Sequence, residues 1–505
     1  MKTSRAKKAM INTVLELLLE AVTVICSFIL PRLILVHFGS TYNGITSSIT
    51  QFIGYVALMK AGIGGVTRAA LYKPLAENDS TRLSSIVNAT SRFMRKIAMI
   101  FSISIVVFAI VYPFMVENDF EWFFSASLVL ILSISTFAQY FFGLTYQMVL
   151  QADQKTYIIS FISIITTVLN TLISSALILL GFGIHIVKLA SAIVFVIPPI
   201  IYNSWVKKEY NINTRVEPDY TTISQRWDAF GHQIAGFINS NFPIILTTIF
   251  LGVKEVSVYT IYNMVCSAIK KLIHAFSSGT TAAFGNLLAN REDKLLKKRF
   301  EQFECLIFFL TTIVVALTVI LILPFVRIYT SGITDVNYMR PTLAALISIS
   351  IYSYCIKLPY EQIVYAAGEF KNTRNSAFIE AGLNIVVSVI LVNFIGLNGI
   401  VLGTIVAALY RVIRYHIYVC DRIIPRRKTK ILMHFVYTIV CIVTSYTLYN
   451  LISFDNPNGY FEWIIQAVIA GVVVVAVSTI YAIFVYRGNL FSIFKLMLRS
   501  IEKRR

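Results

Sequence analysis

The chain has 505 residues, of which 57% are hydrophobic and 14% charged, and its mean hydropathy is +0.73. Soluble proteins average roughly 45–50% apolar and about 25% charged residues, so this composition excludes an ordinary soluble domain. The net charge of +19 would suggest nucleic-acid binding in a soluble protein, but most of the 44 Lys and Arg residues lie in short segments between apolar stretches. We therefore expect no nucleic-acid role and attribute the charge to membrane topology.

The first apolar segment resembles a signal peptide, because four basic residues within positions 2–8 precede it. The run extends to about residue 35, contains Glu16 and Glu20, and is not a short core followed by a small-residue cleavage site. We predict that it is retained as the first transmembrane helix.

About 20 mainly apolar residues are needed to cross a membrane as a helix. The approximate spans are 10–35, 45–66, 97–116, 122–149, 156–180, 184–205, 228–252, 257–284, 303–328, 341–366, 376–395, 398–419, 431–453 and 462–486. An unpaired backbone N–H or C=O group is costly in lipid, and a helix pairs these groups within the segment itself. Other conformations of these long apolar segments are therefore excluded. The predicted fold class is an all-α integral membrane protein with about 14 transmembrane helices.

Basic residues concentrate on alternate connections, which are 68–96, 206–226, 291–299, 411–430 and the tail 487–505. Because Lys and Arg accumulate on the cytoplasmic side, both termini are predicted to be cytoplasmic and the location to be the cytoplasmic membrane. The connections 68–96 and 206–226 are interpreted as surface loops or amphipathic segments next to anionic lipid.

Two stretches of the chain match each other at an offset of 214 residues. Small residues recur in 61–70 and 275–283, and a Leu-Asn pair followed by a Gly turn occurs at Leu169-Asn170 and again at Leu383-Asn384. The prediction is two six-helix repeat lobes, 1–210 and 211–425, with two extra C-terminal helices and a basic tail in 426–505. Repeats of six helices enter the membrane in the same sense, so two such lobes can rock around a central cavity.

This order of features resembles the polysaccharide transporter branch of the multidrug/oligosaccharidyl-lipid/polysaccharide exporter superfamily, which includes the O-antigen-type flippases. The resemblance covers about residues 5–420, and the last two spans are similar to the extra pair of some members, including lipid II flippases. It implies a V-shaped pair of lobes that moves a polyprenyl-diphosphate-linked oligosaccharide across the membrane by alternating access, without catalytic residues. We also expect contacts with other polysaccharide-assembly membrane proteins.

Charged side chains inside the spans are the candidates for transport, because an intramembrane cation costs about 2.5–3.5 kcal/mol and usually faces a cavity. Candidate substrate-binding residues are Lys60, Lys270, Lys271, His274 and Lys357. At the 214 offset Lys60 corresponds to His274, which places cations at similar depth in the two repeats. A diphosphate would bind such a cationic cavity.

Amides in the seventh span, including Asn239 and Asn241, are added as sugar-binding candidates. Asn170 and Asn384 are interpreted as helix-joining residues instead. The last two spans show no charged site and are expected at the periphery.

Buried carboxylates are the candidates for coupling to H⁺ or Na⁺, because a raised pKa lets an acid load and release an ion. Glu16 and Glu20 share a helix face at i, i+4 spacing, and Glu361 is spaced to pair with Lys357. Asp228 and Glu380 are expected to be solvated caps near the cytoplasmic ends of their spans.

The six Cys and six His residues show no ligand spacing, so neither a metal centre nor another cofactor is expected. A lipid II flippase is the main alternative function, and a multidrug or cation antiporter is less favoured. A membrane polysaccharide polymerase or glycosyltransferase is the alternative from a different class, which the short external connections disfavour.

Overall fold

The computed structural model describes residues 5–56, 63–116, 119–221, 241–278, 280–452 and 456–486, and the regular structure of these residues is helical. Two compact units divide the chain, 1–257 and 258–505. Among the described residues, eleven helices are long and apolar enough to cross a membrane. Each coincides with one of the fourteen predicted spans, and the protein is a multi-pass integral membrane protein.

Three predicted spans, 45–66, 228–252 and 257–284, are not among the eleven. Residues 57–62 and 222–240 lie outside the described part, and the short helix Asn241–Leu251 covers the end of the second of these spans. Helix α10 (Val253–Ser278) covers most of the third and is long enough to cross, but its polar residues, Lys270 and Lys271 among them, lower its hydropathy.

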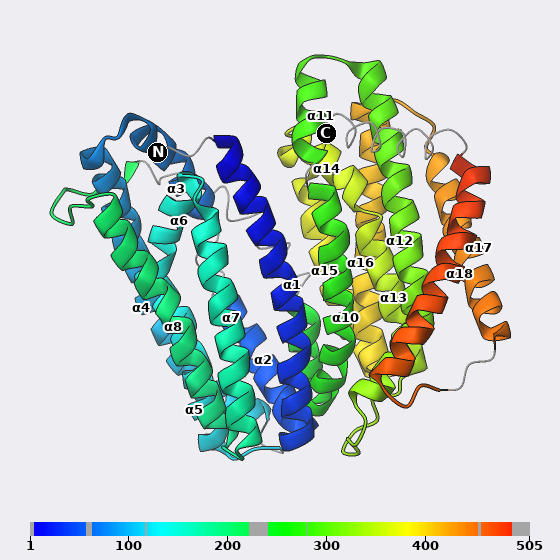
Figure 1. The fold of residues 1–505 in the computed structure, drawn as a ribbon, viewed down its shortest axis with the longest axis horizontal. Helices are drawn as coiled ribbons and strands as arrows, with labels where there is room; N and C mark the ends of the chain where they lie inside the picture. The colour runs from blue at the N-terminus through cyan, green and yellow to red at the C-terminus, as the bar shows by residue number, and fades with distance from the viewer. Residues whose placement is uncertain are drawn as a thin grey trace. The chain divides into compact units, whose positions relative to one another are not determined.

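Unit 1 is a helical bundle. Its helices are α1 (Arg5–Phe38), α2 (Ser40–Val56), α3 (Ile63–Glu77), α4 (Ser80–Val111), α5 (Trp122–Ala138), α6 (Leu144–Ala152), α7 (Thr156–Leu179) and α8 (Ile184–Glu209). Helix α1 packs along α7, and α8 packs against α5 and α7 (Figure 1). Residues of α2, α3, α4, α5, α6 and α8 form one continuous apolar core, in which Phe101, Leu128 and Val149 are fully buried.

Two connections that were predicted as surface segments are in part regular helix. Residues 80–96 form the first half of α4, whose N-terminus is capped by the Asp79 side chain. The loop at 213–217 is held on α4, because Asn88 donates to the carbonyl oxygens of Asn213 and Val216 at 3.0 and 2.8 Å.

The helix Asn241–Leu251 and the first turn of α10 complete unit 1. Asn43 of α2 donates to the Ser257 hydroxyl at 2.9 Å, and Ser48 shares a hydrogen bond of 2.8 Å with Thr248. Gly44 allows this approach, because a Cβ there would lie 1.7 Å from the carbonyl oxygen of Val253.

Unit 2 is built around α12 (Asp293–Tyr329). The other helices are α11 (Thr280–Ala289), α13 (Pro341–Cys355), α14 (Leu358–Ala366), α15 (Phe370–Ile395), α16 (Leu397–Tyr418), α17 (Lys430–Leu451) and α18 (Tyr460–Tyr486). Helix α12 packs against α13, α17 and α18, and α15 and α16 form a close hairpin (Figure 1). The lobe boundaries derived from the repeat, 1–210 and 211–425, stay a prediction.

The two Leu-Asn segments make the same local contact. Ser174 donates to the Asn170 side chain at 3.4 Å, and Ser388 donates to the Asn384 side chain at 3.3 Å. The Asn384 oxygen also accepts from Thr404 of α16 at 3.3 Å, so this residue joins α15 to α16.

The turns that precede α7 and α15 also resemble each other. Asp153 accepts a hydrogen bond of 2.6 Å from the Tyr210 hydroxyl, and Glu369 accepts one of 2.8 Å from Tyr418. Burial alone would raise the pKa of Asp153, but the Tyr210 hydroxyl and the Lys155 ammonium, 2.9 Å away, together bring that pKa below its ordinary value. The turn is therefore held by a carboxylate that is ionised at neutral pH.

Candidate functional site

A cluster of charged side chains lies inside unit 2 around the ring of Tyr354. The ammonium groups of Lys270 and Lys357 lie 5.2 and 5.3 Å from the centre of that ring. Lys270 belongs to α10 and also reaches Ser350 of α13, with its Nζ 3.5 Å from the hydroxyl oxygen. Two cations predicted from separate spans therefore converge on one aromatic side chain, an arrangement that cation–π attraction favours.

A break between helices places Lys357. The sequence predicted one span over 341–366, whereas α13 ends at Cys355 and α14 begins at Leu358. Pro359 explains the break, since proline lacks the backbone N–H that a continuous helix needs and fits the first turn of a new helix. Lys357 lies in the short connection between the two helices.

The Lys357 side chain, 14% exposed, forms an ion pair with Glu380 of α15. Glu361, its predicted partner, also attracts it electrostatically but is not in an ion pair with it. The Lys357 Nζ lies 3.9 Å from Glu380, and Arg411 of α16 approaches the other oxygen of the same carboxylate at 3.6 Å. Glu361 instead accepts a hydrogen bond of 2.9 Å from Tyr365, one turn along α14.

Glu380 is thus not a solvated cap, because it lies ten residues inside α15 and its side chain is only 10% exposed. A carboxylate can be buried there because two cations compensate its charge.

Arg411 is fixed by further contacts. Its guanidinium donates to the carbonyl oxygen of Thr373, to the Ser376 hydroxyl at 2.6 Å and to the Tyr415 hydroxyl at 2.6 Å. The Tyr354 cluster is defined as Lys270, Ser350, Tyr354, Lys357, Glu361, Glu380 and Arg411. With three cationic and two acidic side chains, it carries one positive charge in excess.

The other predicted substrate-binding residues are not part of this cluster. Lys271 and His274 follow on α10 and are exposed. Asn241 begins the helix Asn241–Leu251 in unit 1, half-buried. Lys60 and Asn239 lie outside the described residues, as does Asp228.

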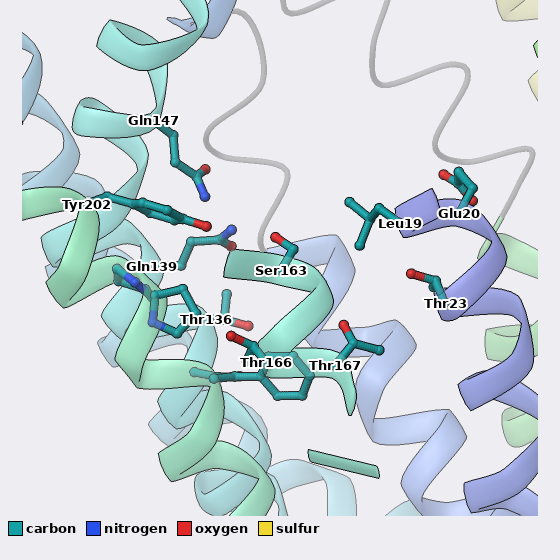
Figure 2. A pocket seen from close by; sticks show the side chains of 14 residues that line it. Leu19, Glu20, Thr23, Thr136, Gln139, Gln147, Ser163, Thr166, Thr167 and Tyr202 are labelled. Atoms are coloured by element: carbon teal, nitrogen blue, oxygen red, sulfur yellow. The ribbon is translucent and has the colours of Figure 1, made fainter. Parts of the chain in front are cut away.

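Unit 1 contains a polar cavity of about 380 Å³ between α1, α5, α6, α7 and α8. It is lined by Leu19, Glu20, Thr23, Ser135, Thr136, Gln139, Gln147, Ser163, Thr166, Thr167, Phe195, Pro198, Pro199 and Tyr202. Figure 2 shows Gln139, Gln147 and the Tyr202 hydroxyl on one side of α7, and Leu19, Glu20 and Thr23 of α1 on the other. Of the two coupling candidates on α1, Glu20 lines the cavity and Glu16 does not.

Irregular backbone surrounds this cavity. A π-helical turn, η3 (Gln139–Gly143), interrupts the path from α5 to α6, and α8 contains Pro198 and Pro199. The two irregularities pack together, since a Cβ on Gly143 would lie 2.9 Å from the Pro199 side chain. Single π-helical turns inside helices are frequent at functional sites.

A second buried charge lies in unit 2, where α17 meets α12. The Glu304 carboxylate accepts hydrogen bonds from both terminal nitrogens of Arg426, one of them at 2.6 Å. It also accepts one of 2.5 Å from the Tyr360 hydroxyl. His434 of α17 lies 3.6 Å from the same carboxylate, and its other ring nitrogen shares a hydrogen bond of 2.8 Å with Tyr486 of α18. We call Glu304, Tyr360, Arg426 and His434 the Glu304 cluster.

The last helix pair therefore does carry part of a charged site, contrary to expectation. The two partners of the ion pair, Glu304 and Arg426, have side chains only 2% and 1% exposed.

Sequence reasoning missed Glu304, Glu380, Arg411 and Arg426 as members of buried clusters. Glu304 stands at the start of a predicted span, and Arg411 and Arg426 belong to a basic connection that was used only to set topology. One signal was available for Arg411: it follows an apolar run without a break, so a helix that continued through it would carry it inward. Among the described residues, no group of three or more His, Cys, Asp or Glu side chains could hold a metal ion.

Comparison with known proteins was made on sequence and on structure. The MatE family model matches residues 235–390. No curated protein matches the sequence. The lipid II flippase MurJ in an inward closed conformation has a similar structure with a TM-score of 0.68 and 14% identity, over 95% of this chain and all of that one.

Two MATE transporters show the same fold. An inward-facing MATE family transporter of the MOP superfamily aligns with a TM-score of 0.61 and 14% identity, over 79% of this chain and 94% of that one. The Vibrio cholerae MATE transporter VcmN aligns with a TM-score of 0.54 and 15% identity, over 83% and 99%. The fold is therefore the one that MurJ and the MATE transporters share.

Proposed function

We propose that this protein is a flippase that moves a polyprenyl-diphosphate-linked oligosaccharide across the cytoplasmic membrane by alternating access, with both termini in the cytoplasm. The Tyr354 cluster is the observation that carries this proposal. Lys270 lies on α10 and Lys357 lies between α13 and α14, and both face one aromatic ring. Together with Arg411 they exceed Glu361 and Glu380 by one positive charge. A diphosphate needs such a site, because charge-assisted hydrogen bonds replace the water that it loses.

The counter-ion of Lys357 gives the cluster a way to exchange ligands. Glu380 bridges Lys357 and Arg411 at 3.9 and 3.6 Å, distances that are long for ion pairs. An entering diphosphate can take over Lys357 while Arg411 keeps Glu380 compensated. Binding then exchanges one anion for another and leaves no buried charge unpaired.

A lipid II flippase is supported to a comparable degree. The MurJ structure covers 95% of this chain, and lipid II is also a polyprenyl diphosphate with a sugar headgroup. A multidrug antiporter is supported by the MATE structures, but the cationic character of the Tyr354 cluster favours an anionic substrate over a cationic drug. The transporter fold favours transport over a polymerase or a glycosyltransferase.

Translocation by the purified protein in liposomes tests the proposal. A fluorescent polyprenyl-diphosphate oligosaccharide would be the substrate, with lipid II compared in parallel. We expect Lys270→Ala and Lys357→Ala each to slow translocation at least about tenfold, the effect of losing about 1.4 kcal/mol of binding. The double variant Lys270→Ala with Lys271→Ala should abolish it.

The matched control is Lys254→Ala, which removes an exposed lysine from the first turn of the same helix. Its rate should equal that of the unchanged protein. Equal rates for the Lys270, Lys357 and Lys254 variants would refute the role of the Tyr354 cluster. Transport of lipid II alone would select the alternative function and leave the role of the cluster intact.

We further propose that Glu20 couples transport to H⁺ or Na⁺. Glu20 lines the polar cavity of unit 1, and Glu16, one turn away, serves as the matched control. Glu20→Gln should make the translocation rate independent of an imposed ion gradient, whereas Glu16→Gln should keep the dependence. A gradient response that survives Glu20→Gln would remove Glu20 from the coupling mechanism.

A further inference from the structure

The polar cavity of unit 1 has a lining suited to an uncharged, hydrogen-bonding ligand. Its polar side chains are five hydroxyl residues of Ser and Thr type on α5 and α7, Thr23, two glutamines, one tyrosine and a single carboxylate. Among the described residues, neither lysine nor arginine lines it, so these residues offer a diphosphate no charge partner. Thr166 and Tyr202 donate to backbone carbonyls of α7, at 2.8 and 3.4 Å, and their hydroxyl oxygens keep the capacity to accept a hydrogen bond from a ligand.

Size and shape limit the occupant. A volume of about 380 Å³ lies near the lower end of the roughly 300–1,000 Å³ that ligand sites of proteins occupy. Phe195 and Tyr202 add aromatic faces to the wall, and Pro198 and Pro199 add rigid apolar surface. Alternating hydroxyl edges and apolar C–H faces are the chemistry of a pyranose ring.

The glutamines supply the specific part of the site. Figure 2 shows Gln139 and Gln147 beside the Tyr202 hydroxyl, with Ser163 of α7 nearby. Each amide has two donor hydrogens and an acceptor oxygen, so one glutamine can bind two adjacent sugar hydroxyls or an acetamido group. Gln139 is also the first residue of the π-helical turn η3.

We propose that this cavity is a binding site for an uncharged sugar unit of the lipid-linked substrate, with Gln139 and Gln147 as the residues that recognise it. The proposal rests on the proposed function, because it assigns the headgroup of that substrate. Glu20 lies in the same lining, so the sugar and the coupling ion occupy one cavity and each affects the binding of the other.

The test measures binding of two lipids to the full-length protein in detergent. One probe is undecaprenyl diphosphate, and the other is the same lipid bearing a single N-acetylglucosamine. We expect the sugar-bearing lipid to bind at least about tenfold more tightly. Gln147→Leu and Gln139→Leu should each remove most of this difference while leaving the affinity for the bare lipid unchanged.

Two further variants keep the result interpretable. Gln147→Asn retains the amide on a shorter side chain and should keep part of the preference, which a folding defect would not produce. Gln51→Leu removes a glutamine of α2 that is not among the lining residues of the cavity, and this variant should keep the full preference for the sugar-bearing lipid. A size-exclusion profile of each variant reports folding.

The outcomes separate the two proposals. Equal affinity for both lipids, or a preference that survives Gln139→Leu and Gln147→Leu, would overturn the sugar site and leave the diphosphate site standing. Binding of neither lipid would overturn the proposed function and the sugar site together.

Discussion

Replacing Arg426 by Met tests whether the Glu304 cluster fastens the last two helices, α17 and α18, to α12 within unit 2. The change keeps the length of the side chain and removes the cation that occupies both oxygens of Glu304. Loss of one partner of a buried ion pair costs about 3–5 kcal/mol, because the other charge stays buried without compensation. Here the Glu304 side chain is 2% exposed, and of its described polar partners Tyr360 and His434 remain.

The connection that contains Arg426 and the start of α17 should therefore open locally more often. Since 1.4 kcal/mol is a factor of ten, the opening equilibrium of residues 424–429 and of the first turns of α17 should rise by about 10²- to 10⁴-fold. Backbone hydrogen exchange measured by mass spectrometry reports such local openings. Peptides from α1 to α8 in unit 1 provide an internal reference whose exchange should stay unchanged.

Two variants provide the controls. Lys428→Met lies in the same connection, but its partner Asp421 is 46% exposed, so this change should cost no more than about 1 kcal/mol. The double variant Glu304→Gln with Arg426→Met removes both charges and should restore much of the protection. Exchange of Arg426→Met within fivefold of the unchanged protein would refute the reasoning, as would a double variant no better protected than the single one.

Two further predictions follow from contacts in the turns and hairpins. The lowered pKa of Asp153 means that its contribution to stability is present above the unfolded value of about 4 and is lost as the pH falls through the folded value. Tyr210→Phe should therefore lower stability by about 1 kcal/mol at pH 7 and by less below pH about 4, and melting curves from pH 7 to 3.5 that differ by a constant amount would contradict this. Gly403→Ala should destabilise the α15–α16 hairpin by several kcal/mol, because the new Cβ would lie 2.7 Å from the backbone nitrogen of Ser388. Gly471→Ala, with open space around it, should leave the melting temperature unchanged or raise it.

Hydropathy predicts the helices of this protein well because each span satisfies its own backbone groups, so the signal is local. Residues 97–116 and 303–328 were identified as spans. Helix α4 contains most of the first and α12 contains all of the second, each with a long extension at its N-terminal end. The extensions were missed because their basic residues lower the hydropathy without ending the helix. The break at Lys357 was readable from Pro359 but was passed over in a run of apolar residues.

The candidate site was predicted only in part, for a different physical reason. A lysine inside an apolar span is energetically unfavourable and therefore indicates a function, and this argument identified Lys270 and Lys357 from the sequence. Their partners come from other helices, and the packing of helices is not visible in a single sequence. Glu380 therefore looked like a solvated cap, although Lys357 and Arg411 make its burial possible. The cavity of unit 1 was invisible for the same reason, apart from Glu20.

The hydrogen bond between Asn43 and Ser257 has a consequence for the origin of the chain. The two residues are 214 positions apart, which is the offset of the predicted repeat, so that repeat would make each the counterpart of the other. If the chain arose by fusion of two copies of a six-helix ancestor, this contact descends from a residue that met its own copy across a two-fold axis. In such a homodimer one side chain must act as donor and acceptor at once. After a fusion the two positions can carry different residues, here a donor amide and an acceptor hydroxyl. The residue types at the two positions should then covary among descendants of that fusion.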